Sequence, residues 1–343
     1  MLAIFSHTAQ SFSEAVFAHC RRGKTHAERL YRHWMQGQPL STLEVEPQAR
    51  PLIEEIAGMT DFSLPTLSRL TEEGGTVKYL LKLHDGLECE SVIIPMRGFA
   101  TLCISSQIGC RMGCTFCETG RMGLIRSMTT EEIVAQVYYA TRVLQKPVRN
   151  IVFMGMGEPL DNFEAVMRAV SVLTDPGGLN FGHARITIST SGRVDEIDQL
   201  TLSADPALNL AVSVNAPNDA IRRKIMPVNV KWNMAALKEA MVRYCAHPRR
   251  QILIEYVLLK DVNDSLESAD ELAAYLQGLN VKVNLIPYNP QSRSRFAPPD
   301  ADVQAAFLAR MRDHGYLTML RKTKGRAIMA ACGQLGSKSA RLN

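Results

Sequence analysis

Three cysteines lie within eight residues of one another, in the run Cys110-Arg111-Met112-Gly113-Cys114-Thr115-Phe116-Cys117. The C-x3-C-x2-C spacing suits an iron–sulfur cluster or a zinc ion, because both prefer soft thiolate ligands. Structural zinc sites use four ligands, usually in two separated pairs. The spacing is also too tight for two independent disulfides. The run therefore favours a four-iron cluster that keeps one iron open for another ligand.

Composition places few limits on what these cysteines do. The 343 residues are 46% hydrophobic and 21% charged, which is typical of a globular chain of one large or two smaller domains. A net charge of +5 permits a polyanionic partner without requiring one. The N-terminus lacks the features of a signal peptide, and no apolar stretch approaches the roughly 20 residues that span a bilayer. We expect a cytoplasmic protein with no membrane partner, where closely spaced cysteines more often bind metals than form disulfides.

Residues 1–60 read as a small helical accessory domain. Leu30, Tyr31 and Trp34 recur at helical spacing on this segment. The same segment carries a basic cluster, made of Arg21, Arg22, Lys24, Arg29 and Arg32. Such a cluster is either a solvated surface or an RNA contact, because basic faces with nearby aromatic rings suit phosphates and bases.

The remainder of the chain predicts an α/β fold. Two β-type runs at 77–83 and 91–95 flank Asp85-Gly86, a hairpin turn signal, and indicate a β-hairpin extension over residues 61–97. Between 98 and 315, near-continuous apolar strands alternate with amphipathic helices, which indicates a parallel sheet. About six such units are fewer than a closed barrel needs, so we expect a partial (β/α)6 barrel. Residues 316–343 would add a C-terminal strand and a mobile loop carrying Cys332.

In such folds the working groups lie at the C-terminal ends of the strands. The cysteine run follows the first predicted barrel strand, and the next strands are followed by residues 155–159, 189–192 and 213–215. The last strand is followed by Pro287-Tyr288-Asn289-Pro290. Glycines at 155 and 157 would let the backbone approach a ligand closely. Together these segments predict a ligand cradle beside the three cysteines.

Several of these stretches resemble one family. Phe116 between the last two cysteines and Gly157-Glu158-Pro159 are similar to motifs of radical S-adenosylmethionine (SAM) enzymes. The resemblance narrows to the RlmN/Cfr family of RNA adenine methyltransferases over about residues 88–336. Four stretches in family order carry it: Thr-Leu-Cys-Ile-Ser-Ser-Gln-Ile-Gly-Cys at 101–110, Met-Gly-Met-Gly-Glu-Pro-Leu at 154–160, Asn-Leu-Ile-Pro-Tyr-Asn-Pro at 284–290 and Ala-Ala-Cys-Gly-Gln-Leu at 330–335.

The resemblance implies two cofactors. The family's [4Fe–4S] cluster would be held by Cys110, Cys114 and Cys117, and its open iron would chelate SAM. The positions that match SAM contacts in the family are Gly157, Glu158, Ser189, Ser213, Val214, Asn215 and Asn289. Where the family usually has Ser-Leu-His, this chain has Ser213-Val214-Asn215. The change is harmless if the contact is made by backbone atoms, and alters SAM binding if the imidazole is used.

The resemblance also implies a mechanism with two SAM molecules per turnover. Cys332 matches the cysteine that takes a methyl group from the first SAM, and a 5′-deoxyadenosyl radical from the second would abstract hydrogen from that methyl. The resulting carbon radical adds to the adenine ring. Cys103 matches the thiol that resolves the adduct by forming a disulfide with Cys332, and Glu90 matches the proposed proton acceptor. Taken without the resemblance, Cys103 reads as a buried core thiol, Cys332 as an idle surface thiol, and Glu90 as a solvated carboxylate.

We therefore predict a monomeric methyltransferase that acts on C2 of the peptidyl-transferase-centre adenosine in 23S rRNA. A tRNA anticodon-loop adenosine is a second candidate substrate, and a flavodoxin or ferredoxin would supply electrons. C8 of the same rRNA base is the alternative, since both chemistries share these motifs. A radical-SAM activase or peptide-modifying enzyme would not need Cys103 and Cys332 together, and a non-catalytic RNA-binding protein would not need the cluster cysteines. The basic stretches at 222–224 and 321–326 suit phosphate binding, though each is also compatible with simple solvation.

Overall fold

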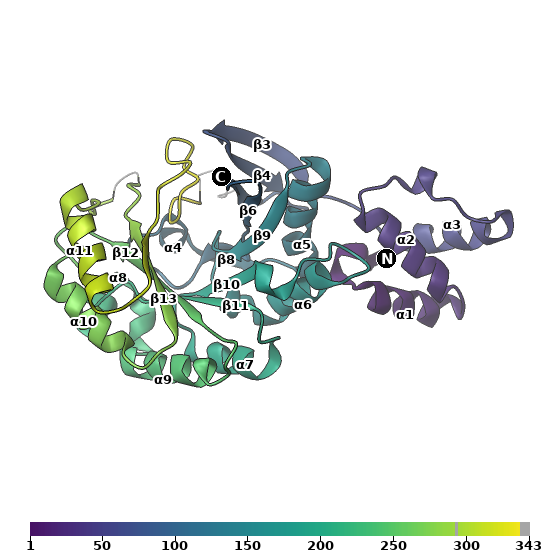
Figure 1. The fold of residues 1–343 in the computed structure, drawn as a ribbon. Coiled ribbons are helices and arrows are strands. Elements are labelled where there is room, and N and C mark those ends of the chain that lie inside the picture. The colour runs from purple at the N-terminus through teal and green to yellow at the C-terminus, as the bar shows by residue number, and fades with distance from the viewer. Residues whose placement is uncertain (292–293, 337–343) are drawn as a thin grey trace.

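The apolar runs of the sequence form the centre of one large sheet. The computed structural model describes residues 1–291 and 294–336 (Figure 1). Its ten-stranded sheet has the order β14-β13-β12-β11-β10-β9-β6-β5-β4-β3. The parallel part comprises β6 (Ala100–Cys103), β9 (Val148–Phe153), β10 (Ile186–Thr190), β11 (Asn209–Ser213), β12 (Ile252–Leu258), β13 (Val281–Pro287) and β14 (Thr318–Leu320).

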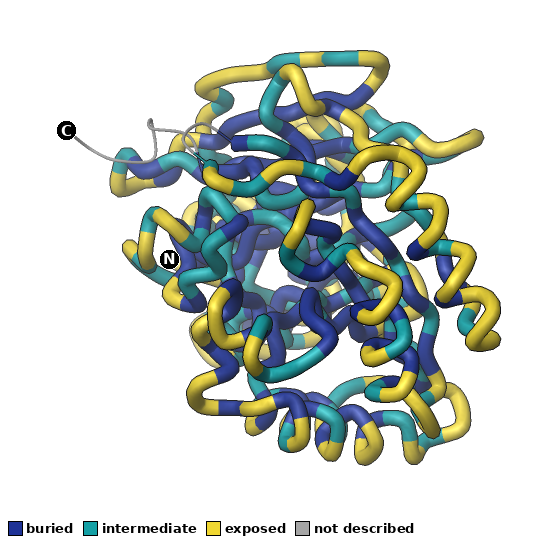
Figure 2. Tube along the Cα trace, turned by 90° about the vertical axis from the view of Figure 1, so that its left-hand side faces the viewer, coloured by how far each residue is buried: buried dark blue, intermediate teal, exposed yellow. Residues whose placement is uncertain are grey.

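Helices cover the outer face of the curved sheet and leave its inner face to the site (Figure 1). They are α5 (Thr130–Tyr138), α6 (Phe163–Thr174), α7 (Val194–Ser203), α8 (Asp219–Ile225), α9 (Met234–Cys245), α10 (Leu266–Leu276) and α11 (Ala301–Asp313). The start of α5 illustrates how the sequence sets these boundaries, because Thr129 and Glu132 form the reciprocal capping box expected of that motif. Apolar side chains of these helices are buried against the strands. In Figure 2, the chain trace is dark blue where its residues are buried, mainly in the interior. The predicted partial barrel is confirmed.

An antiparallel extension continues the sheet beyond the barrel. It consists of β3 (Thr66–Glu73), β4 (Thr76–Lys82) and β5 (Glu88–Pro95), with β5 paired to β6. The turn between β4 and β5 contains Gly86 at φ 84°, as the Asp-Gly signal requires. Strand β3 escaped the sequence analysis because it is a mostly polar, solvent-exposed edge strand without an apolar run.

The N-terminal segment is mostly helical and lies beside α5 and α6 in Figure 1. Its helices are α1 (Ala9–Cys20), α2 (Lys24–Met35) and α3 (Arg50–Gly58), and a short parallel pair joins β1 (Leu2–Ala3) to β2 (Thr60–Asp61). The Tyr138 hydroxyl of α5 donates to the Trp34 carbonyl at 3.0 Å. Leu30 and Tyr31 are buried, whereas all five residues of the basic cluster are exposed to solvent.

Two further segments complete the mouth of the barrel. The strands β7 (Gln107–Cys110) and β8 (Gly123–Ser127) pair antiparallel, with the short helix α4 (Glu118–Met122) between them. Residues 321–336, which we call the C-terminal strap, leave β14 and run toward the β3–β5 extension (yellow in Figure 1). Within the described ranges, every helix is too short or too polar to cross a bilayer.

Candidate active site

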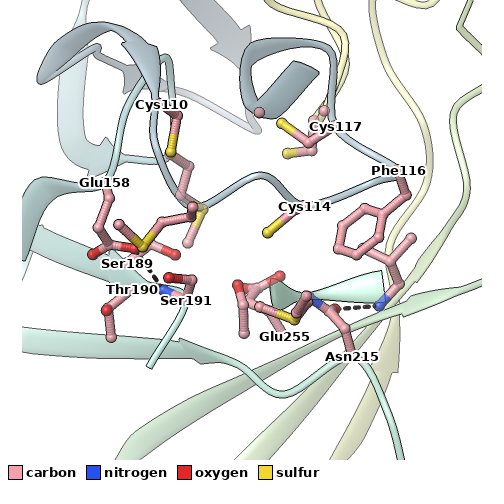
Figure 3. A pocket seen from close by; sticks show the side chains of 18 of the residues that line it. Cys110, Cys114, Phe116, Cys117, Glu158, Ser189, Thr190, Ser191, Asn215 and Glu255 are labelled. Carbon is pink, nitrogen blue, oxygen red and sulfur yellow. Dashed lines mark hydrogen bonds between the residues drawn. The ribbon is translucent and has the colours of Figure 1, made fainter. Parts of the chain in front are cut away.

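The β7–β8 pair turns the cysteine run into a loop whose three thiols face one cavity. Cys110 ends β7, and Cys114 and Cys117 lie on the loop that leads into α4. All three line a cavity of about 160 Å³, and their sulfur atoms surround the same space in Figure 3. Each of the eight cysteines carries a free thiol, so no disulfide competes for these sulfurs.

The arrangement of the thiols fits a cluster better than a single ion. Burial raises the pKa of all three, that of Cys114 to about 12, so these thiols need a strong cationic group to become thiolates. In the described part of the chain, no set of three His, Cys, Asp or Glu side chains closes around one ion position. Three cysteine thiols that face one cavity are the kind of ligand that holds an iron–sulfur cluster.

The second loop of the cradle approaches the first through its glycines. Gly157 has φ 103°, and a Cβ there would lie 2.6 Å from the Cβ of Gln107, on β7. A Cβ on Gly155 would similarly lie 2.6 Å from the Ile104 carbonyl oxygen. The glycines therefore let this loop pack closely against neighbouring backbone. The sequence analysis had explained the same glycines by the close approach of a ligand. Gly157 still contributes to the cavity wall.

Glu158 places a buried carboxylate beside the cysteines. One of its oxygens accepts a hydrogen bond from the Ser191 backbone N–H at 2.7 Å, and the other from Leu160 N–H at 3.2 Å. Burial raises its pKa, and these backbone donors oppose that shift. A buried anionic group that faces a cavity suits a cationic ligand such as the ammonium or sulfonium of SAM.

The remaining predicted SAM contacts divide into two groups. Ser189, Ser213, Asn215 and Asn289 line the same cavity, at the ends of β10, β11 and β13. Val214 is fully buried outside the cavity wall. Its N–H donates to the Glu255 carbonyl at 3.1 Å, and its own carbonyl accepts from Arg222. Its role as a SAM contact therefore stays a prediction.

A second chamber of about 390 Å³ is lined by both remaining predicted cysteines, Cys103 and Cys332. We call it the deeper chamber because residues near the start of the barrel strands, such as Leu253 on β12, line it. Cys332 also lines the first cavity, so this residue stands at the junction of the two. Burial raises the pKa of the Cys103 thiol to about 12, and the neighbouring Arg321 opposes the shift. The Asn289 side chain, which follows β13, holds Cys332 and the strap in place by donating to the Cys332 carbonyl at 3.2 Å.

Comparison with known proteins assigns this architecture. The Radical SAM superfamily matches residues 104–273. A probable dual-specificity RNA methyltransferase RlmN 1 of Protochlamydia amoebophila is 49% identical over 98% of this chain and 94% of its own length. The dual-specificity RNA methyltransferase RlmN of Syntrophotalea carbinolica is 43% identical over 84% of this chain and 81% of its own. The chain belongs to the RlmN family of radical-SAM RNA methyltransferases.

A solved structure extends the comparison to the whole fold. The crystal structure of a radical SAM methyltransferase from Sphaerobacter thermophilus matches with a TM-score of 0.88 and 37% identity, over 97% of this chain and 99% of that one. Membership in the RlmN family implies an iron–sulfur cluster and SAM as cofactors. The predicted family, fold class and enzyme class are thereby confirmed.

Within this RlmN-family chain, the Asn215 side chain is directed away from solvent and into the protein. Asn215 has φ 55°, a left-handed conformation that asparagine tolerates. Its Oδ1 accepts from the Val257 backbone N–H at 2.8 Å, and its Nδ2 donates to the sulfur of Met226 at 3.3 Å. The side chain is occupied by these partners, and the Asn215 carbonyl accepts from the Asn263 side chain at 2.7 Å, so a ligand would meet Asn215 through its backbone N–H or by packing contact.

We therefore expect Asn215→Gly to leave SAM binding nearly intact while it lowers stability. Glycine keeps the left-handed backbone but leaves the half-buried Val257 N–H without its Asn215 acceptor, which costs about 1 kcal/mol. The SAM concentration dependence of 5′-deoxyadenosine formation should change by less than roughly threefold, an effect under 1 kcal/mol. Thermal unfolding and SAM titration check the two parts. A tenfold weaker SAM dependence would show instead that the side chain contacts the cofactor.

Three residues that line the deeper chamber were not predicted as site residues. Glu255 and Asn284 were assigned no role in the site, and Arg321 was read as part of a basic stretch. Glu255 on β12 and Asn284 on β13 are register partners, and the Asn284 amide donates to both carboxylate oxygens at 3.2 and 3.0 Å. Arg321 lines the same chamber, and the neighbouring Cys332 sulfur is the main cause of its raised pKa. The sequence offered one signal for Glu255, because it is a charged residue in the middle of an otherwise apolar strand.

Arg222 corrects the reading of residues 222–224 as a phosphate-binding patch. Its side chain is completely buried. The guanidinium donates to the carbonyls of Val214 at 3.1 Å, Ser191 at 2.6 Å and Ser213 at 3.2 Å, and to the Asn229 side chain at 3.0 Å. Arg222 therefore ties together the loops after β10 and β11 and takes no part in a surface for RNA.

Glu90 is located apart from both cavities. It is fully buried on β5, and neither cavity wall includes it. It nevertheless shares a sheet face with Cys103, because Val92 pairs with Cys103 and Glu90 precedes Val92 by two residues. The Ser105 hydroxyl donates to the Glu90 carbonyl at 2.7 Å and joins this strand to the one that carries Cys103.

Proposed function

We propose that this enzyme methylates C2 of the peptidyl-transferase-centre adenosine of 23S rRNA, with a tRNA anticodon-loop adenosine as a second substrate. The observation that carries the proposal is the position of Cys332, which lines both the cavity beside the three cluster cysteines and the deeper chamber with Cys103. A sulfur at this junction is able to receive a group on one side and deliver it on the other. The name of the Protochlamydia relative, dual-specificity RNA methyltransferase, supports two kinds of RNA substrate.

Each proposed residue has a distinct part in the reaction. Cys110, Cys114 and Cys117 would hold the cluster, and Gly157, Glu158, Ser189, Ser213, Val214, Asn215 and Asn289 would hold SAM. When bound, these two groups supply a methyl group for the Cys332 sulfur and then a radical that removes one hydrogen atom from it. An aromatic ring carbon is too weak a nucleophile for direct methyl transfer, so this activation is needed.

The residues of the deeper chamber would complete the transfer. The sulfur-bound methylene radical on Cys332 adds to the adenine ring. The adduct would then return one electron to the iron–sulfur cluster and lose its ring proton to Glu90. The Cys103 thiolate then attacks the Cys332 sulfur. The new S–S bond releases the methylene with its bonding electrons, and protonation makes it the product methyl group. A dithiol reductant, itself oxidised to a disulfide, would restore the two thiols by exchange.

The scheme uses two SAM molecules per turnover and an electron donor, which we propose to be a flavodoxin or ferredoxin acting on a monomeric enzyme. We also propose a division into a helical accessory domain (1–60), an extension (61–97), the barrel (98–315) and a C-terminal segment (316–343). The exposed basic cluster on the first of these supports its role in RNA contact.

Mass spectrometry of RNA nucleosides after an anaerobic reaction tests this function directly. The purified enzyme is incubated with SAM, a reductant and either unmodified 23S rRNA or unmodified tRNA. We expect 2-methyladenosine in the rRNA, mapped to the peptidyl-transferase centre, and a smaller yield in tRNA. The appearance of 8-methyladenosine would select the C8 alternative, and the absence of any methylated adenosine would overturn the assignment.

A further inference from the structure

One lysine connects Glu90 to the strap that carries Cys332. Lys78 on β4 is 5% exposed and Glu90 is 0% exposed, and the Lys78 Nζ lies 2.7 Å from a Glu90 carboxylate oxygen. The same Nζ donates to the backbone carbonyl of Met329 in the strap at 3.0 Å. A single buried ammonium therefore contacts both a carboxylate and the strap.

Strand register places this pair next to the chemistry. Lys78 pairs with Val92, and Val92 pairs with Cys103, so the three residues form one row across β4, β5 and β6. Residues paired across neighbouring strands point to the same face of a sheet, and residues two apart along a strand do as well. Lys78 and Glu90 are therefore on the face of the sheet from which Cys103 enters the deeper chamber.

The strap is constrained at the point where Lys78 binds it. Met329 has φ 52°, a conformation that costs about 1–2 kcal/mol in a residue with a side chain. Met329 lies three residues before Cys332, and its carbonyl is the acceptor that Lys78 engages. A substitution of Lys78 would therefore affect both the Glu90 carboxylate and the backbone that leads to Cys332, the methyl-carrying cysteine.

A fully buried carboxylate needs a counter-charge with good geometry. We propose that Lys78 is a positioning residue for Glu90, which it orients and neutralises while it holds the strap closed over the pair. This inference rests on the role of Glu90 as proton acceptor in the proposed function. It assigns the charge of Lys78 to the adduct-resolving half of the reaction, and it leaves the methylation of Cys332 independent of that charge as long as the hydrogen bond to the strap is kept.

A purely structural ion pair would behave differently. Breaking it would destabilise the sheet and the strap together, so that every step of the reaction would fall in parallel. The decisive variants are Lys78→Gln, which keeps an N–H donor for the strap but removes the charge, and Lys78→Arg, which restores the charge. Lys82→Gln is the matched control, because Lys82 lies on the same strand and face but is exposed.

The experiment follows three products in one anaerobic reaction with unmodified 23S rRNA: methylated Cys332 peptide, 5′-deoxyadenosine and covalent protein–RNA adduct. We expect Lys78→Gln to methylate Cys332 normally, to accumulate adduct and to release methylated RNA at least about tenfold more slowly. This is less than the roughly 10²–10⁴-fold typical for complete loss of a general base, because Glu90 itself is still present. Lys78→Arg should recover most of the rate, and Lys82→Gln should match the unmodified enzyme.

A double-variant comparison shows whether Lys78 acts through Glu90. Adduct resolution in Lys78→Gln/Glu90→Gln should be no slower than in Glu90→Gln alone, because the partner that Lys78 serves is already missing. Multiplied losses, normal turnover of Lys78→Gln, or a parallel fall in Cys332 methylation would each overturn the proposal. If Glu90→Gln itself resolves the adduct normally, the fault lies in the proposed role of Glu90, which is a separate result.

Discussion

Replacing Cys332 by alanine should abolish RNA methylation while SAM cleavage continues. The cluster cysteines and the cradle around Glu158 do not depend on the Cys332 sulfur, so reductive formation of 5′-deoxyadenosine should persist. Cys332 is the one cysteine among the described residues that lines both cavities, so the variant would lose the proposed methyl carrier. Removal of a covalent nucleophile typically lowers a rate by roughly a thousandfold or more.

Two assays on the same preparation separate these effects. Chromatography of 5′-deoxyadenosine reports SAM cleavage, and methyl incorporation from labelled SAM reports transfer to 23S rRNA. Cys245→Ala is a suitable control, because Cys245 lies at the end of α9, lines neither cavity and donates to the Asn280 carbonyl at 3.7 Å. Methylation of RNA by the Cys332→Ala enzyme at more than a few per cent of the normal rate would refute the carrier role.

The sequence was sufficient for those parts of the fold that have a periodic apolar pattern. The buried strands and amphipathic helices of the barrel were predicted because each must bury one face, and that requirement leaves a period in the sequence. The capping box at Thr129 is a local motif and was equally visible. Strand β3 lacks this pattern, since only its backbone pairs with β4 and most of its side chains are exposed.

The site was predictable where residues act through local spacing, and unpredictable where they meet through the fold. Cys110, Cys114 and Cys117 are close in sequence and therefore close in space. Arg222 is different, because only the tertiary structure reveals that its guanidinium is surrounded by carbonyls from two other loops. A basic run is normally a solvated surface, so nothing in the sequence distinguishes this arginine from its neighbours.

The Lys78–Glu90 pair shows the same limit for charges in a sheet. Its two members are 12 positions apart on different strands, and the strap acceptor at Met329 is 251 positions away from Lys78. The sequence alone favours a solvated Glu90 in a hairpin, because carboxylates are rarely buried without a partner. The pairing becomes visible only once strand register brings the lysine alongside.

Replacing Cys103 by alanine should stop the reaction one step later than Cys332→Ala, with enzyme and RNA covalently joined. Cys332 would still receive its methyl group and form the carbon bond to adenine, but no thiolate would be present to release it. Release of methylated RNA should fall by roughly a hundredfold or more, as expected on loss of a nucleophile. The joined species should be visible as a slowly migrating, ribonuclease-sensitive band on a denaturing gel.

A matched control distinguishes this stall from general damage to the sheet. Cys89 is also fully buried, on neighbouring β5, and it alternates with Glu90 so that it faces the opposite side of the sheet. Cys89→Ala should therefore turn over without accumulating the joined species. Clean turnover by Cys103→Ala would remove its resolving role, and equal accumulation in both variants would point to the sheet instead of the thiol.

The unmodified enzyme should show a pH dependence of the same step. Burial raises the pKa of Cys103 to about 12, so at assay pH values only a small fraction is thiolate, and that fraction rises with pH. Adduct resolution, measured in single-turnover reactions, should accelerate by about tenfold per pH unit while pH stays below this pKa. Methylation of Cys332 need not follow the same profile, because it does not use Cys103. A resolution rate that is flat or falls with pH would mean that Cys103 is not the attacking thiol, whatever the gel shows.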